Sequence, residues 1–153
     1  ERIVLGHVLS MTEEDLQNVI SMIMHNDFCI GSDGSVTTNK GSYACRLQHV
    51  SDRHIFIQLH ALLFTKSSFT AEGYGFLAAL YLLRAFYNYF HIVPAPKTIN
   101  SFIDNQPLIQ QLSYGKENSI KHVNCRDSAL IREINSVLDS LAITIHRKHV
   151  KSH

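Results

Sequence analysis

Apolar side chains recur along this chain at two different spacings, and each change of spacing marks a new element. The first set recurs at helical spacing and predicts an amphipathic helix with one buried side, formed by Leu16, Val19, Ile20, Ile23 and Met24. Ser10, followed three residues later by Glu13, matches a capping box and predicts where this helix begins. The polar residues 25–27 are expected to end it.

Three short strands are predicted next, over residues 28–33, 42–50 and 54–64. Polar residues 35–41 separate the first two strands, and the turn 51–53 separates the second from the third. In the third strand, apolar side chains alternate with their neighbours, as expected where one side of a strand is buried; they are Ile55, Ile57 and Leu59. Connections this short predict three successive antiparallel strands.

The second half of the chain alternates between helical and extended patterns. The expected elements are a helix over 70–90, a strand over 98–104, a short helix opened by Pro107, a polar loop over 114–121, a helix over 127–141 and a strand over 142–150. The two long helices carry apolar stripes, at Phe76, Ala79, Leu80 and Leu83 and at Leu130, Ile134, Val137, Leu138 and Leu141. The order predicts an α/β fold, a mixed five-stranded sheet with helices on both faces.

Length and composition indicate one soluble globular domain. The chain has 153 residues, of which 45% are hydrophobic and 18% charged. The longest apolar run, residues 75–83, is far shorter than the ~20 residues that a membrane span needs, and no signal peptide is recognised, so no membrane is expected. Cys29, Cys45 and Cys125 form no C-x-x-C pair, which disfavours a disulfide framework or zinc ribbon and favours a reducing, intracellular compartment, cytoplasmic or nuclear.

The formal net charge is only +1, but basic residues gather at the C-terminus, where Arg147, Lys148 and Lys151 stand among three histidines. Such a cluster binds phosphates in some proteins and is a solvated chain end in others. A third interpretation is a transition-metal site of His146, His149 and His153. It is disfavoured because residues 146 and 149 of a strand face opposite sides.

Three carboxylates stand where this order of elements would bring them together. Asp33 and Asp104 end the first and fourth strands, and ligands gather at the carboxyl ends of parallel strands in such sheets. Glu72 lies in the first turns of the long helix, in line with the apolar stripe that packs on the sheet. Taken singly, the two aspartates suit a turn or a helix N-cap and Glu72 suits the helix dipole. Together they predict a site for Mg²⁺, which prefers oxygen ligands.

The motifs that carry these acids resemble the ribonuclease H family. They read SDGS (32–35), GSYACRL (41–47), TAEGYGFLAAL (70–80), FIDNQPLI (102–109) and HRKHVKSH (146–153). Their wording is similar to the ribonuclease H domains that follow reverse transcriptases in cellular retroelements. The resemblance covers residues 28–153 and leaves 1–27 as a lead-in helix, a connection from an upstream polymerase domain.

The resemblance implies a role for eight residues. Asp33, Glu72 and Asp104 would hold two Mg²⁺ ions, with Mn²⁺ as a substitute. His153 would assist product release or proton transfer. The implied contacts to the nucleic acid are Gly34, Ser35, Ser68 and Gln106.

The sequence departs from the family pattern in three places. The fourth family acid follows the histidine loop, and the sequence ends at His153, so we expect the domain to stop before its final helix. Ser68 and Phe69 replace two asparagines that read RNA 2′-hydroxyls; serine retains a hydrogen-bonding group, whereas phenylalanine can only pack or stack. The loop 114–121 is too short for the extra basic helix of some members.

The predicted function is an endonuclease that hydrolyses the RNA strand of RNA/DNA hybrids, beside an adjoining reverse transcriptase domain. The main alternative is a catalytically inactive nucleic-acid-binding or connection domain of the same fold. A transposase or integrase core is disfavoured because such domains take their third acid from a late helix, whereas Glu72 precedes Asp104.

Overall fold

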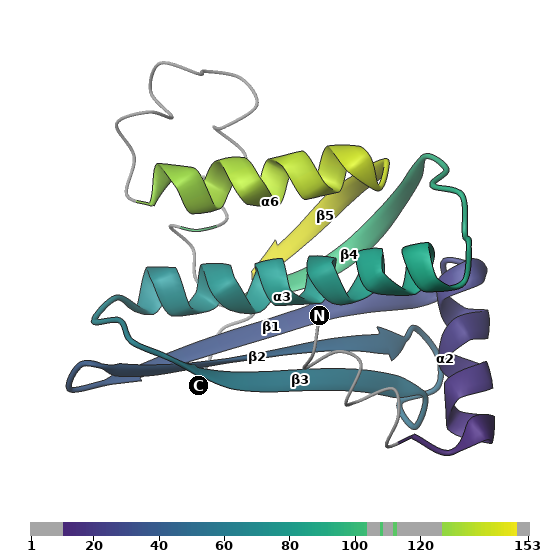
Figure 1. Ribbon diagram of the computed structural model, residues 1–153, viewed down its shortest axis with the longest axis horizontal. Coiled ribbons are helices and arrows are strands. Elements are labelled where there is room, and N and C mark those ends of the chain that lie inside the picture. Colours follow the sequence, from purple (N-terminus) through teal and green to yellow (C-terminus); the bar gives the residue numbers. More distant parts are fainter. Residues whose placement is uncertain (1–10, 104–107, 109–111, 113–126, 150–153) are drawn as a thin grey trace.

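A single twisted sheet forms the centre of the molecule (Figure 1). The computed structural model describes residues 11–103, 108, 112 and 127–149. Residues 147–149 are described by their backbone alone. The elements are α2 (Glu13–Met24), β1 (Phe28–Thr37), β2 (Lys40–His49), β3 (Phe56–Leu63), α3 (Ser68–Tyr89), β4 (Lys97–Ile103), α6 (Ser128–Ser140) and β5 (Ile143–His149). The short helix expected at Pro107 falls at residues outside this description.

The predicted mixed five-stranded sheet is confirmed. Its strand order is β3-β2-β1-β4-β5. Strands β1, β2 and β3 pair antiparallel, while β4 runs parallel to both β1 and β5. The central strand β1 therefore lies between an antiparallel and a parallel neighbour, and the end of β4 pairs with Ser32 in the middle of β1.

Helices α3 and α6 pack side by side on the same side of this sheet (Figure 1). The strands direct their buried side chains toward them, among these Ile30, Leu47, Ile57, Ile99 and Ile145. Both predicted helical stripes are buried: Phe76, Ala79, Leu80 and Leu83 of α3 are fully covered, as are Ile134, Val137 and Leu138 of α6 to within 2%. On the other side of β1–β3, the side chains of Asp33, Ser35, Gln58, His60 and Leu62 are exposed.

Helix α2 packs against the end of the sheet and contributes Val19, Ile20, Met22 and Ile23 to the same core. Its predicted start at Ser10 is wrong. The N-cap is Thr12, whose Oγ1 accepts a 3.2 Å hydrogen bond from the Asp15 N–H. Met24 is 57% exposed, and Met22 is buried in its place because it stands three residues after Val19.

The first two strands are longer than predicted. Residues 35–37 pair with residues 40–42 instead of belonging to a loop over 35–41, and the connection is the two-residue turn Thr38-Asn39. Both turn residues have positive φ, 51° and 99°, as a tight hairpin requires. Polar composition suggested a break here, but strand pairing across the sheet extends the ladder to its tip.

Candidate active site

Asp33 lies on β1 with its side chain exposed on the side of the sheet away from α3. The N–H of Gly34 donates a 2.9 Å hydrogen bond to Asp33 Oδ1 and so restricts the orientation of the carboxylate. Because side chains alternate along a strand, the next residue faces the opposite side, toward α3. Asp33 therefore belongs to the open surface, and Gly34 to the contact with the helix.

Glu72, in the second turn of α3, is only 4% exposed. One serine before the helix, Ser67, and the glycine after Glu72, Gly73, explain this placement. Ser67 caps the helix, since its Oγ accepts a hydrogen bond from the Thr70 N–H at 3.2 Å. Gly73 allows Leu130 of α6 to pack directly against α3, because a Cβ there would lie 2.6 Å from Leu130 Cδ2. Burial of a carboxylate is costly unless the charge is compensated, which suits a cation ligand.

Backbone contact joins the strand of Asp33 to the helix of Glu72. A Cβ on Gly34 would lie 2.5 Å from the Glu72 nitrogen and 2.6 Å from the Ala71 carbonyl carbon. One helical turn later, a Cβ on Gly75 would lie 3.1 Å from the backbone carbonyl oxygen of Asp33. Only glycine permits such an approach without displacing backbone atoms. The backbone segments that carry the two acids, 39 residues apart in sequence, are thus brought into contact.

The parallel strand β4 ends at the same place. Its last residue, Ile103, pairs with Ser32, the residue before Asp33. Asp104 follows Ile103 directly in the chain, although Asp104, Gln106 and His153 lie outside the described residues. The prediction that Asp33 ends the first strand is wrong, because β1 continues to Thr37; it is the parallel pairing of β1 with β4 that ends one residue before Asp33.

The predicted substrate-contacting residues occupy different surroundings. Ser35 is exposed on the same side of the sheet as Asp33, and its Oγ shares a 2.9 Å hydrogen bond with Ser42 Oγ on β2. Ser68 is the exposed first residue of α3. Phe69 is only 4% exposed, so of the two possibilities for this side chain, packing and stacking, it packs in the core.

A cavity of about 370 Å³ opens beside Asp33 on the open side of the sheet. Its walls come from β1, β2 and β3, and include Asp33, Ser35, Ser42, Ala44, His60 and Leu62. The register explains the space: Ala44 pairs with both Asp33 and His60, so a methyl group separates two larger polar side chains. Burial raises the pKa of Tyr43, which also lines the cavity, so its phenol stays protonated as a donor near neutral pH.

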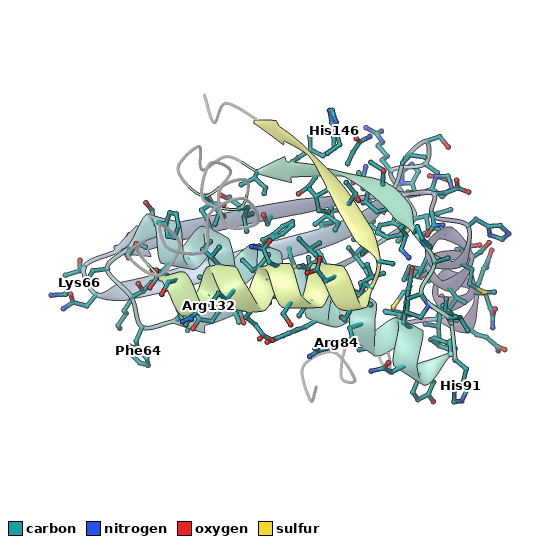
Figure 2. All side chains as sticks on the ribbon, turned by 90° about the horizontal axis from the view of Figure 1, so that it is seen from above. Phe64, Lys66, Arg84, His91, Arg132 and His146 are labelled. Carbon is teal, nitrogen blue, oxygen red and sulfur yellow. The ribbon has the colours of Figure 1, made fainter. Side chains whose placement is uncertain are left out.

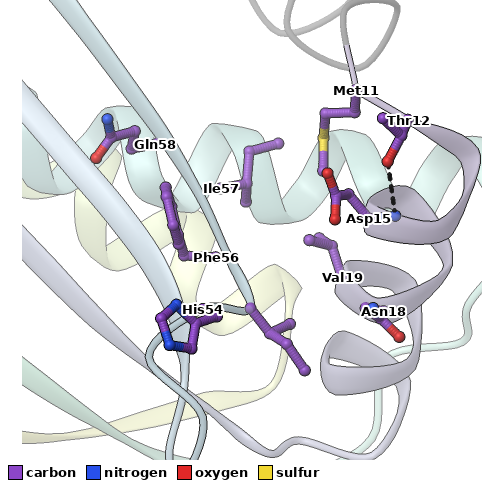
Figure 3. A pocket seen from close by; sticks show the side chains of 10 residues that line it. Met11, Thr12, Asp15, Asn18, Val19, His54, Phe56, Ile57 and Gln58 are labelled. Carbon is purple, nitrogen blue, oxygen red and sulfur yellow. Dashed lines mark hydrogen bonds between the residues drawn. The ribbon is translucent and has the colours of Figure 1, made fainter.

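A second cavity of about 350 Å³ lies between α2 and the start of β3 (Figure 3). Met11, Val19 and Phe56 supply its apolar wall, and Asp15 and His54 are its two ionisable groups. It contains none of the predicted acids, so the cavity beside Asp33 is the better candidate for the active site.

Sequence reasoning found the acids but missed Ser42, Ala44 and His60. Ser42 and Ala44 lie in the motif GSYACRL, which was given no role in the site, and no quoted motif includes His60. The signal that finds them is the strand register, which sets them across from Ser35 and Asp33. A hairpin register could have been proposed from the Thr38-Asn39 turn, had that turn been recognised.

The donor set fits a hard divalent cation, since both described acids offer carboxylate oxygens. Among the described residues no three His, Cys, Asp or Glu side chains lie close enough together to hold a metal ion. The third predicted ligand, Asp104, is outside that part of the chain. His146 is exposed on β5, and no such cluster within the described residues includes it.

No protein-family model matches the sequence, and no curated protein matches it. Solved structures match its fold. The N-terminal RNase H domain of Rv2228c from Mycobacterium tuberculosis superposes with a TM-score of 0.59 and 13% identity, over 81% of each chain. RNase H1 from the archaeon Halobacterium salinarum gives 0.54 and 18%, over 80% of this chain and 85% of that chain.

A viral protein matches as well. The foamy viral protease-reverse transcriptase, solved with double-stranded DNA, gives a TM-score of 0.52 and 18% identity over 86% of each chain. The structural neighbours of this chain are ribonuclease H domains, and the chain has the ribonuclease H-like fold. No described helix is both long and apolar enough to cross a membrane.

Proposed function

We propose that this protein is an endonuclease that hydrolyses the RNA strand of RNA/DNA hybrids. The observation that carries the proposal is the contact of Gly34 with Ala71 and Glu72, at the place where β4 ends beside Ser32. This contact joins the backbone next to Asp33 to the backbone of Glu72, beside the end of the strand that leads to Asp104, and this supports a shared site. A ribonuclease H-like fold with acids at these three sites suits phosphodiester hydrolysis.

Asp33, Glu72 and Asp104 would hold two Mg²⁺ ions, or Mn²⁺ in their place. When bound, the ions supply activation of the attacking water and stabilisation of the leaving oxygen. Glu72 contributes a charge in a buried environment, where its attraction for a cation is less screened than at the surface. Asp33, oriented by the Gly34 N–H, presents its carboxylate to the open side, from which the substrate arrives.

The remaining predicted residues would hold the substrate. Ser35 and Ser68 are exposed and would contact the nucleic acid, and Gln106 would reach the minor groove. The backbone at Gly34 would lie close to the RNA strand. His153 would assist product release or proton transfer.

Two structural neighbours support the substrate class and the context. LC11-RNase H1, with a TM-score of 0.55 and 13% identity, was solved in complex with an RNA/DNA hybrid, over 80% of this chain and 85% of that chain. The foamy viral neighbour is a protease-reverse transcriptase. We accordingly propose that this domain adjoins a reverse transcriptase and works inside the cell.

Cleavage of a labelled hybrid tests the proposal directly. The wild-type chain should release shortened RNA from an RNA/DNA hybrid in Mg²⁺ or Mn²⁺ and leave the DNA strand intact. Asp33→Asn and Asp104→Asn should each lower the rate at least 100-fold, because removal of a metal-ligand charge weakens ion binding. Asp52→Asn is the matched control: Asp52 Oδ1 accepts the His54 N–H at 2.9 Å, which an amide oxygen can replace.

Metal binding separates the enzyme from its inactive alternative. Mg²⁺ should raise the melting temperature of the wild type, since a ligand that binds the folded state stabilises it, and Glu72→Gln should lose this rise. Intact RNA together with no Mg²⁺-dependent rise would contradict the proposal. It would leave a nucleic-acid-binding domain of the same fold.

A further inference from the structure

An exposed stripe runs along β3 and continues past its end. Alternate residues His60, Leu62, Phe64 and Lys66 are all exposed, while Ala61, Leu63 and Thr65 between them are half-buried. Leu62 is 88% and Phe64 92% exposed, the highest values among the large apolar side chains of the described residues. We call these four residues the β3 stripe. Neither Leu62 nor Phe64 is part of the buried core, and adjacent exposed apolar side chains are typical of a binding surface.

The β3 stripe is continuous with the cavity beside Asp33. His60 and Leu62 form one wall of that cavity. Ala44 on β2 pairs with Asp33 on β1 and with His60 on β3, so the three residues form one row across the sheet. Asp33 and His60 are therefore two strand spacings, or about 10 Å, apart. In the adjoining row, Leu62 pairs with Ser42, which is hydrogen bonded to Ser35. A chain bound at Asp33 would therefore meet the stripe next.

The end of the stripe is held close to the same part of the sheet. A Cβ on Gly41 would lie 2.8 Å from Thr65 Cγ2 and 3.4 Å from the backbone carbonyl oxygen of Ser35. The segment after β3 therefore packs on the β1–β2 hairpin. Figure 2 shows Phe64 and Lys66 projecting at one end of the molecule. The path from Asp33 to Lys66 thus crosses a contiguous surface.

The chemistry of the stripe suits an unpaired nucleic-acid strand. An exposed aromatic ring stacks on a base, and basic or hydrogen-bonding side chains beside it contact phosphates. Bases inside a duplex are already stacked on their neighbours, so only an unpaired base offers its face to a ring. His60 and Lys66 flank the two apolar residues, which places phosphate contacts on either side of a stacking surface.

We propose that the β3 stripe binds a single-stranded segment of the substrate next to the cleavage site, with Phe64 stacked on a base and His60 and Lys66 contacting phosphates. The inference rests on the proposed function, because it assigns the nearby site to a nuclease. It adds a substrate preference: hybrids with a single-stranded extension should be favoured over blunt hybrids of equal duplex length.

The test compares these two hybrids by fluorescence anisotropy in Ca²⁺, and by cleavage in Mg²⁺. The wild type should bind the extended hybrid about five- to tenfold more tightly than the blunt one, as expected for one stacked base. Phe64→Ala should abolish the difference without weakening binding to the blunt hybrid, and Phe64→Trp should retain it. Lys66→Ala should reduce the difference and also its dependence on salt.

Tyr89→Ala is the matched control. Tyr89 is an aromatic residue that is 68% exposed at the opposite end of α3, so its loss should leave the preference unchanged. Equal binding of both hybrids by the wild type, or a preference that survives Phe64→Ala, would overturn the inference. So would an oligomer that Phe64→Ala dissociates while nucleic-acid binding is unchanged, because the stripe would then be an interface between copies.

The outcomes for the stripe and for the nuclease are distinguishable. Cleavage of both hybrids at equal rates, abolished by Asp33→Asn, would uphold the proposed function and reject the stripe. A Phe64-dependent preference in binding with no cleavage of either hybrid would uphold the stripe as a single-strand site and reject the nuclease.

Discussion

At the scale of single residues, two glycines of β1 have opposite surroundings. A Cβ on Gly34 would lie within 3.0 Å of three atoms of Ala71 and Glu72, two of which belong to the backbone, whereas a Cβ on Gly31 would meet nothing within 4 Å. Neither glycine has a positive φ, so space alone separates them. The comparison therefore shows that β1 packs tightly on α3 at Gly34, next to Asp33, and not at Gly31.

Gly34→Ala should lower the free energy of unfolding by about 1–3 kcal/mol, because the added methyl forces helix and strand apart. It should also reduce hybrid cleavage, since the shift separates the two acids. Gly31→Ala should change stability by less than about 0.5 kcal/mol. Urea denaturation of the two variants provides the measurement, and equal losses in both would show that the contact at Gly34 is not constraining.

At the scale of elements, α3 is held to its two neighbours by different means. It meets β1 and β2 through Gly34 and Gly75, and α6 through Gly73 and a hydrogen bond from Thr70 Oγ1 to Asp127 Oδ2. Asp127, at the N-cap of α6, makes no capping hydrogen bond with its side chain. Its carboxylate instead accepts the hydrogen bond from Thr70 and so connects the starts of α3 and α6. Thr70 stands two residues before Glu72 in the chain.

Thr70→Val should lower the free energy of unfolding by about 1.5–3 kcal/mol, because valine cannot donate the hydrogen bond that Thr70 makes to the Asp127 carboxylate. In an Asp127→Ala background the same substitution should cost much less, which a double-mutant cycle by thermal or urea unfolding would reveal. Thr98→Val, an exposed substitution on β4, serves as the control. Additive losses would mean that the two side chains do not interact in solution.

At the scale of the whole molecule, one core joins the sheet to all three described helices, and it includes ionisable groups. Cys45 is 2% exposed beneath α3, and burial raises the pKa of its thiol from 9.0 to about 11. Burial likewise raises the pKa of Tyr87. A raised pKa in the folded state means that the unfolded chain loses its proton first as the pH rises.

The stability contributed by a neutral Cys45 should therefore be complete below pH 9 and be lost between pH 9 and about 11, by about 2–3 kcal/mol in total. The Cys45→Ala variant should lose less stability than the wild type between pH 9 and 11, because it has no thiol to ionise. At pH 7 the variant should be less stable than the wild type, because the smaller side chain packs less well. Urea unfolding at pH 7, 9 and 10.5 provides the curve. Parallel curves for the two proteins would indicate that Cys45 ionises equally in both states.

Much of this fold could be predicted from the sequence because the relevant signals are local. Helical spacing of Phe76, Leu80 and Leu83 identified α3, and the extended segments on either side implied the sheet topology. Element ends were less predictable, because they depend on partners: Thr12 replaced Ser10 as a cap, and pairing with β2 lengthened β1 to Thr37. The burial of Glu72 also followed from helical spacing, since it lies four residues before Phe76.

The sequence by itself determined the order of the described elements and their buried stripes, because each depends on residues a few places apart. The tertiary structure alone decided that β1 is central, that Gly34 rather than Gly31 contacts the helix, and that His60 lies across the sheet from Asp33. It also decided that Phe69 is in the core while Phe64 is exposed. These choices depend on strand register and on backbone contact between distant segments, and such contacts are set only when the whole sheet and its helices pack together.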